Sequence, residues 1–193
     1  MVNAFANSPR ALLTALFLSG DSPTKAGSVR SAGNVLEAAA ARARDQGIVV
    51  LELGVQQASE ARSLASFHAA IALQSVRFGR PAAPTLVLSA GAVPGPQGES
   101  EAARFQLALA LSLDSHPTIH GLALAPMLPD AAACTGFVLA PDTVARARTA
   151  GLDAGAQLLA GRSDDLFTRL GDCINLSGTG SDTVLRAIFL SPD

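Results

Sequence analysis

Short runs of apolar residues alternate along the chain with longer stretches in which apolar residues recur every three or four positions. The short runs are typical of strands buried on both faces, and the longer stretches of helices that bury one side. The predicted strands cover residues 48–53, 85–89, 120–125, 136–139 and 172–176, and a further apolar run covers 184–190. The predicted helices cover residues 11–18, 31–45, 60–77, 99–113, 141–150, 154–159 and 164–170. This alternation predicts an α/β fold, a three-layer sandwich with a mostly parallel sheet flanked by helices.

The length of the chain, 193 residues, suits one domain with a full core. We expect an N-terminal helix and linker over residues 1–26 and an α/β domain over residues 27–193. Ligands of such sheets bind at the carboxyl ends of the strands. A site is therefore expected in the loops after Leu53, Ser89, Ala125 and Leu176.

Composition narrows the class of protein. Hydrophobic residues make up 49% of the chain and charged residues 16%, which is typical of a globular protein. The aromatic residues are all Phe, and the net charge is −2, so the sequence excludes a nucleic-acid partner. No apolar run approaches the ~20 residues that span a bilayer. We therefore expect a cytoplasmic protein with no membrane partner.

Cysteine and histidine are too few and too scattered for a metal centre. The two cysteines, Cys134 and Cys173, fit neither a disulfide scaffold nor a zinc site. The histidines are His68, His116 and His120, and Pro117 separates the last two, which argues against one continuous helix face. No metal ligands are predicted.

A glycine loop with hydroxyl side chains lies between the apolar runs 172–176 and 184–190. It reads Gly178, Thr179, Gly180, Ser181. Glycine lets backbone N–H groups approach an anion, and hydroxyls add donors. Thr179, Gly180 and Ser181 can therefore bind a phosphate or carboxylate, and the alternative is a tight connection between two buried elements.

Four further candidates lie near the predicted strand ends. Gly91 follows the strand 85–89 and can approach an anion, although a simple turn also explains it. Arg104 and Gln106 lie on the helix 99–113, where a guanidinium can clamp a carboxylate or phosphate or can instead extend to solvent. Asp130 is the lone acid in the loop after the third strand, and it can act as a base or simply form a turn.

Six short motifs carry a family resemblance. They are Ser-Glu-Ala-Arg at 59–62, Leu-Val-Leu-Ser-Ala-Gly-Ala at 86–92, Arg-Phe-Gln at 104–106, Gly-Phe-Val-Leu at 136–139 with Asp142-Thr143, Asp-Leu-Phe at 165–167 with Gly171-Asp172, and Thr-Gly-Ser-Asp at 179–182. In this order they resemble the MOFRL domain, the C-terminal domain of the class II glycerate 2-kinases, which are often named hydroxypyruvate reductases. The resemblance covers residues 27–190 and implies an ATP- and Mg²⁺-dependent kinase acting on glycerate.

Departures from the family pattern affect its polar residues. The acid of the family's Ser-Gly-Gly-Glu is Ala92 here, and two polar partners of the motif arginine fall on Phe105 and Leu107. The family's Thr-Asp-Gly-Ile-Asp-Gly reads Ala-Pro-Met-Leu-Pro-Asp at 125–130, and its larger N-terminal domain has no counterpart. Apolar side chains cannot position the charges that phosphoryl transfer needs. We therefore expect a filled, apolar pocket and no kinase turnover by this chain alone.

Three hypotheses about function remain. The first is a degenerate glycerate-kinase-like protein that binds a small carboxylate or phosphate through Thr179, Gly180, Ser181 and Arg104, or acts as a partner subunit. The second is part of an active glycerate kinase, completed by another chain and using ATP and Mg²⁺, with Arg104, Asp130 and Thr179 surviving. The third is a structural or oligomerisation domain. A homo-oligomer or a partner chain is expected.

Overall fold

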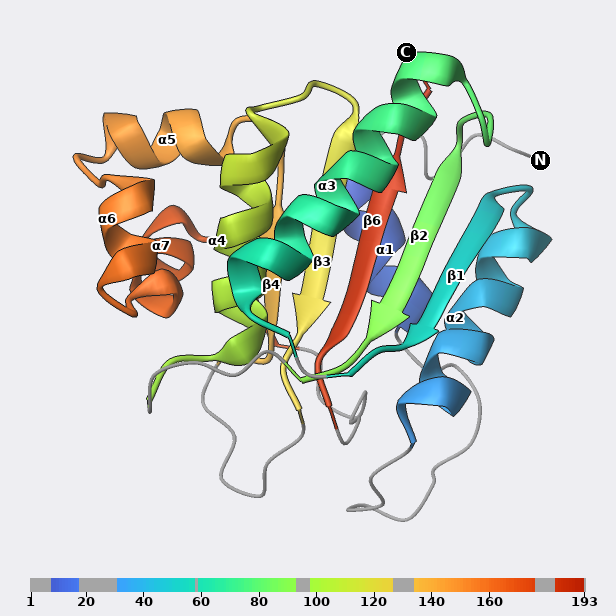
Figure 1. Cartoon of the computed structure of the whole chain (residues 1–193), viewed down its shortest axis with the longest axis horizontal. Coiled ribbons are helices and arrows are strands. Elements are labelled where there is room, and N and C mark those ends of the chain that lie inside the picture. The colour runs from blue at the N-terminus through green and yellow to red at the C-terminus, as the bar shows by residue number, and fades with distance from the viewer. Residues whose placement is uncertain are drawn as a thin grey trace.

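The protein is a three-layer α/β structure in which helices cover both faces of a six-stranded sheet (Figure 1). The computed structural model describes residues 8–17, 31–57, 59–92, 98–126, 134–175 and 183–192. The strands are β1 (Val49–Val55), β2 (Thr85–Ala90), β3 (Ile119–Leu124), β4 (Gly136–Leu139), β5 (Cys173–Ile174) and β6 (Leu185–Leu190). The helices are α1 (Pro9–Phe17), α2 (Ala32–Asp45), α3 (Ala61–Phe78), α4 (Glu101–Leu113), α5 (Thr143–Thr149), α6 (Ala154–Leu159) and α7 (Ser163–Leu170). The predicted three-layer α/β sandwich is confirmed.

The sheet is mixed, which corrects the expectation of mostly parallel pairing. Its strand order is β1-β2-β6-β3-β4-β5, and among these neighbours only β1 and β2 pair in parallel. Strands β1, β2, β3 and β5 do share one direction, as helical crossovers require. The final apolar run of the chain forms β6, which inserts antiparallel between β2 and β3 and so replaces the parallel contact there.

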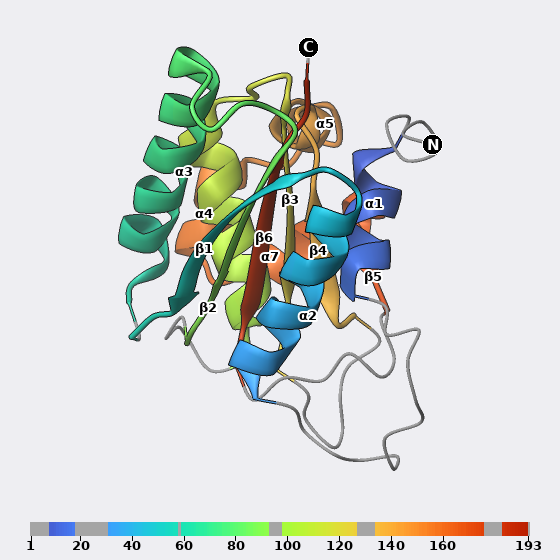
Figure 2. The same cartoon turned by 90° about the vertical axis from the view of Figure 1, so that its right-hand side faces the viewer.

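The two helical layers bury separate halves of the core (Figure 2). Helices α3 and α4 pack on one face of the sheet, and α1 and α2 pack on the other. Helix α1, which we assigned to an N-terminal segment, buries Leu12, Leu13 and Leu16 in the same core as α2 and the sheet. Strands β2, β4 and β6 are buried along their whole length, which explains their near-continuous apolar sequences.

Helix α3 is fixed at both ends by local chemistry. The Glu60 carboxylate accepts a hydrogen bond from the Ser63 backbone N–H at 2.9 Å and so caps the start of the helix. Gly79 ends the helix in the left-handed conformation, with φ of 60°.

No helix among the described residues, α3 included, is long and apolar enough to cross a membrane.

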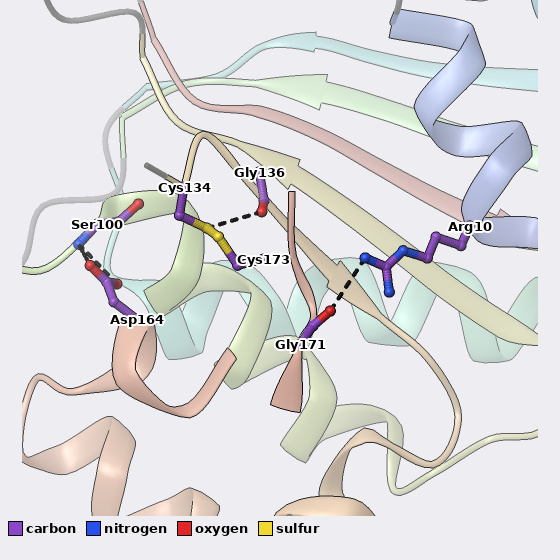
Figure 3. The surroundings of a disulfide bond; sticks show 7 residues. All are labelled: Arg10, Ser100, Cys134, Gly136, Asp164, Gly171 and Cys173. Atoms are coloured by element: carbon purple, nitrogen blue, oxygen red, sulfur yellow. Dashed lines mark hydrogen bonds between the residues drawn. A yellow bond between two sulfur atoms is a disulfide. The ribbon is translucent and has the colours of Figure 1, made fainter. Parts of the chain in front are cut away.

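A disulfide joins Cys134 to Cys173, so our interpretation that the cysteines form no disulfide was wrong (Figure 3). The two residues are 39 positions apart in sequence, but their Cα atoms are 5.5 Å apart. Cys134 lies just before β4, and Cys173 in β5 pairs with Phe137 of β4. The number and spacing of the cysteines in the sequence do not reveal this bond, because only the pairing of β4 with β5 brings the two thiols together.

Candidate functional site

The candidate site lies at the carboxyl ends of β1, β2 and β3, at the lower edge of the sheet in Figure 1. Backbone hydrogen bonds join the segments that leave these strands. The Gln56 N–H donates to the Ala90 carbonyl at 2.8 Å, and the Gly91 N–H donates to the Val184 carbonyl at 3.0 Å. The start of β6 therefore lies beside the ends of β1 and β2, at the edge where the sequence predicts a ligand.

A buried arginine, Arg186, is the central charged residue of this edge. It lies on β6, directly opposite Ser89 of β2, and only 1% of its surface is exposed. Its Nε donates to Ser89 Oγ at 3.0 Å, and its Nη1 donates to the Gly91 carbonyl at 3.0 Å. The guanidinium lies over the Phe105 ring, 5.2 Å from the ring centre. Its remaining nitrogen, Nη2, is buried with no hydrogen-bond partner among the described residues.

Ser89 connects Arg186 to a second buried polar residue, His68 of α3. His68 Nδ1 lies 2.8 Å from the Leu64 carbonyl, so we assign the proton to Nδ1, which donates to that oxygen. His68 Nε2 then accepts a hydrogen bond from the Ser89 hydroxyl at 2.8 Å. Burial lowers the pKa of His68 to about 4, so the imidazole is neutral at pH 7. The Ser89 hydroxyl therefore donates one hydrogen bond and accepts one, and neither His68 nor Ser89 brings a negative charge to Arg186.

The charge of Arg186 has no close carboxylate to neutralise it. Within the described part of the chain, no carboxylate oxygen lies within ion-pair distance of its guanidinium, although Glu101 attracts it from farther away. Burial lowers the pKa of Arg186 to about 10, which still leaves it charged at neutral pH. A buried charge is costly unless it is paired and hydrogen-bonded. The site therefore lacks a negative partner.

Gly91, one of the predicted binding residues, is part of this site. Its φ is 140°, and a Cβ there would lie 2.5 Å from the Gln56 carbonyl oxygen and 3.1 Å from Arg186 Nη2. Only glycine fits between these groups. The side-chain oxygen of Gln56 is also buried without a partner among the described residues. Gln56 Oε1 and the cationic Arg186 Nη2 therefore both lack a hydrogen-bond partner among the described residues, and both residues lie beside Gly91.

Arg104, the predicted clamp, is already held by a carboxylate. Its Nη1 donates to Glu99 Oε2 at 3.1 Å, and the other Glu99 oxygen accepts hydrogen bonds from the backbone and hydroxyl of Ser163, the first residue of α7. In return, the Asp164 carboxylate accepts a hydrogen bond from the Ser100 N–H at the start of α4, at 3.0 Å (Figure 3). Burial raises the pKa of Asp164. Glu99 and Asp164 thus link the starts of α4 and α7 by hydrogen bonds. Arg104 is bound to Glu99 in this link.

Gln106 is a residue of α4, and its side chain lies against Gly121 in the middle of β3, away from the strand ends. It is fully buried, and its Nε2 lies 2.7 Å from where a Cβ of Gly121 would be. Both polar atoms of its amide lack partners among the described residues. The structure does not bring Gln106 to Arg186, since Phe105 is the residue of α4 that faces the guanidinium.

The other predicted site residues, Asp130, Thr179, Gly180 and Ser181, lie outside the described residues, so their roles stay predictions. Sequence reasoning missed Arg186 and His68. Arg186 is the lone charge in the apolar run 184–190, which is the signal that could have identified it.

Comparison with known proteins finds similarity in sequence to a longer protein. No family model matches the chain. A protein of Agrobacterium vitis named "Putative hydroxypyruvate reductase" is 34% identical over an alignment of 197 residues. The alignment covers 91% of this chain and 44% of the relative. The chain therefore spans less than half the length of this curated relative.

Solved structures share the fold. The crystal structure of glycerate kinase from Thermotoga maritima matches 83% of this chain and 40% of its own, with a TM-score of 0.71 and 16% identity. A Pyrococcus horikoshii protein matches 84% of this chain and 39% of its own, with a TM-score of 0.67 and 17% identity. The predicted resemblance is confirmed: the chain is related in sequence to a protein named as a hydroxypyruvate reductase and has a glycerate-kinase-like fold.

Proposed function

We propose that this chain is a glycerate-kinase-like domain of the MOFRL type that binds a small carboxylate or phosphate at the carboxyl ends of its strands, without transferring a phosphoryl group by itself. The observation that carries this proposal is the buried guanidinium of Arg186, which has an unpartnered Nη2 and no carboxylate within ion-pair distance among the described residues. Guanidinium groups bind carboxylates and phosphates through strong, directional hydrogen bonds. A small anion is the partner that this site lacks.

The names of the similar proteins favour the same class of ligand. Hydroxypyruvate and glycerate, which appear in those names, are both small carboxylates with a neighbouring oxygen substituent. In the proposed complex, Arg186 Nη2 donates to an oxygen of the anion. A Cβ at Gly91 would lie 3.1 Å from this nitrogen, so a larger residue there would crowd it. Thr179, Gly180 and Ser181 stay the predicted additional donors.

We infer that this chain alone transfers no phosphoryl group, because two positions that are polar in the family are apolar here. Mg²⁺ prefers carboxylate oxygens, and both oxygens of Glu99 are already engaged. No group of three His, Cys, Asp or Glu side chains in the described part of the chain is placed to hold a metal ion. Phe105 and Leu107, at positions that are polar in the family, are fully buried in the core. A kinase with ATP and Mg²⁺, completed by another chain, remains the alternative.

Thermal unfolding tests the proposal, with glycerate, tartronate, phosphoglycerate, inorganic phosphate and Mg-ATP as probes. A ligand at ~100 times its Kd stabilises the native state by about 2.7 kcal/mol, which raises Tm by about 5 to 10 °C in a chain of this size. We expect at least one small anion to give this shift in the parent chain. The shift should disappear in Arg186→Met and persist in the control Arg169→Met, which removes an exposed arginine of α7.

The pattern of shifts distinguishes the ligands and the alternatives. A shift with glycerate and tartronate but not with phosphate identifies a carboxylate site, and the reverse pattern identifies a phosphate site. No shift with any probe overturns the proposal and favours a structural domain. Formation of ADP from Mg-ATP and glycerate by the isolated chain overturns the claim that it does not transfer phosphoryl groups.

A further inference from the structure

The Cys134–Cys173 disulfide lies at the same edge of the sheet as the candidate site. Gly136, at the start of β4, pairs with Leu124, the last residue of β3, so Cys134 lies beside the carboxyl end of β3. Its partner Cys173 belongs to β5, a strand of two residues that is last in the sheet order. Both cysteines are half-buried, so the bond lies near the surface, where small thiols can approach it.

The disulfide braces a backbone hydrogen bond between two strand ends. Each cysteine directly precedes one partner of that bond, in which the Thr135 N–H donates to the Ile174 carbonyl at 3.0 Å. The Thr135 carbonyl in turn accepts from the Ala125 N–H, just after β3, at 2.9 Å. Thr135 therefore connects the ends of β5 and β3. Without the disulfide, an edge hydrogen bond near the surface holds the end of β5, and such bonds open readily.

A row of paired residues crosses the sheet from the disulfide to Arg186. Cys173 pairs with Phe137, Phe137 with Ala123, Ala123 with Arg186, and Arg186 with Ser89. Paired residues on neighbouring strands direct their side chains to the same face of a sheet. Three strand spacings of about 4.8 Å separate Cys173 from Arg186. The disulfide is thus a covalent anchor at one end of a row that holds the buried guanidinium near its other end.

The amino end of β5 is attached without the disulfide. The Val138 N–H donates to the Asp172 carbonyl at 2.9 Å, and Arg146 forms an ion pair with the Asp172 carboxylate. Arg10 of α1 donates to the Gly171 carbonyl at 3.3 Å (Figure 3). Reduction of the disulfide therefore leaves this end of the strand in place and frees only its carboxyl end. The change is local, so it can be reversed without unfolding.

We propose that the Cys134–Cys173 bond is a redox switch of the anion site, and that the oxidised chain binds its anion more tightly than the reduced chain. This inference rests on the proposed function. Oxidation holds Thr135 against Ile174 and, through the paired strands, orders the row that contains Arg186. A site that is ordered in advance binds at a lower entropic cost. Where disulfides occur in reducing compartments, they are usually transient and redox-sensing.

The switch is operated by thiol–disulfide exchange with a small dithiol. One thiolate of the dithiol attacks a sulfur of the protein disulfide, forms a mixed disulfide and releases the other cysteine as a thiolate, which takes up a proton. The second thiol of the dithiol then displaces the first cysteine. Two electrons and two protons pass to Cys134 and Cys173, and the dithiol becomes a cyclic disulfide. A small disulfide reverses the reaction by the same steps.

Isothermal titration calorimetry on the full chain tests the switch, with glycerate and inorganic phosphate as probes. We expect reduction with dithiothreitol to raise the Kd of the bound anion about fivefold or more, the scale of ordinary coupling between sites. Reoxidation with oxidised glutathione should restore the original Kd. The double variant Cys134→Ser, Cys173→Ser should bind as the reduced parent does, and dithiothreitol should not change its Kd.

A stability control separates the switch from a general weakening of the fold. Leu36→Ala leaves a cavity in the core under α2, on the face of the sheet opposite to Arg186, and so destabilises the chain without touching the row. We expect this variant to keep the anion affinity of the oxidised parent. Amide hydrogen exchange gives a second readout. Reduction should accelerate exchange at Thr135 and Ala125, whereas the Val138 amide should stay protected.

The outcomes distinguish this inference from the proposed function. Absence of binding in both redox states overturns the proposed function and the switch with it. Binding with the same Kd in both states overturns the switch and leaves the anion site intact. A loss of affinity in Leu36→Ala as large as that caused by reduction also overturns the switch, and so does unchanged exchange at Thr135 on reduction.

Discussion

Arg186 and Ser89 occupy paired positions on β6 and β2, and Arg186 Nε donates to Ser89 Oγ over 3.0 Å. This one hydrogen bond links the guanidinium to His68 through the Ser89 hydroxyl and fixes the orientation of the charged group. The arrangement leaves Nη2 without a partner among the described residues. The fold thus holds a buried positive charge in place, and no carboxylate of the described residues lies within ion-pair distance of it.

The stability of Arg186 variants distinguishes a binding role from a structural one. Replacing a buried charged group by an apolar side chain of similar volume is often neutral or stabilising, by up to about 2 kcal/mol. We expect this for Arg186→Met in urea unfolding, although anion binding is lost. Arg186→Ala leaves a cavity and should lose about 2 to 4 kcal/mol. A Met variant destabilised as much as the Ala variant would show that Arg186 mainly holds the fold together.

The burial of His68 predicts a loss of stability in weak acid. Its pKa in the folded chain, about 4, is below the ordinary value of 6.5 because burial disfavours the charged imidazole. The unfolded chain therefore binds the proton more tightly. The full contribution is present above pH 6.5 and is lost as the pH falls toward 4, by about 3 kcal/mol. Urea unfolding at a series of pH values should show this slope in the parent, and a smaller slope in His68→Gln. Equal slopes in the two proteins would contradict the assignment.

Loss of the Cys134–Cys173 disulfide should weaken the fold. The bond closes a loop with a sequence separation of 39, for which chain entropy gives a stabilisation of about 4 kcal/mol at most. We expect dithiothreitol to lower the free energy of unfolding of the parent by about 2 to 4 kcal/mol. The double variant Cys134→Ser, Cys173→Ser should be equally weakened and should not respond to reductant. Two free thiols in the native, unreduced protein, detected by alkylation and mass spectrometry, would refute the bond. Disulfides are rare in reducing compartments such as the cytoplasm. The cytoplasmic location that the sequence predicts is therefore at odds with this bond, and it stays a prediction.

The buried Glu99 should contribute far more stability than an exposed carboxylate. Its side chain is 1% exposed and binds both Arg104 and Ser163. Removing one partner of a buried pair costs about 3 kcal/mol or more, and we expect this for Glu99→Ala in urea unfolding. The matched control is Glu52→Ala, which removes the carboxylate of the exposed Arg44–Glu52 pair and should cost less than about 1 kcal/mol. Similar losses in the two variants would contradict the role of Glu99 in joining α4 to α7.

The local sequence predicted most of the elements, because their signals act over a few residues. Ser31 caps α2 through its side chain, and Gly79 ends α3, as their residue types suggest. The apolar run 136–139 is the buried strand β4. The alternation of these elements was enough to predict a three-layer α/β fold, and the order of short motifs was enough to predict its likeness in fold to a glycerate kinase.

The tertiary structure decided how distant segments meet, because the local pattern of a strand does not specify its neighbour. The insertion of β6 between β2 and β3 made the sheet mixed and placed Arg186 beside Ser89, 97 residues away in sequence. The pairing of β4 with β5 brought Cys134 to Cys173. Arg104, promising in sequence, is engaged by Glu99 at the start of its own helix. The sequence by itself determined which segments are buried and predicted a ligand at the carboxyl ends of the strands, whereas the packing of the strands decided which charged group lies at that edge.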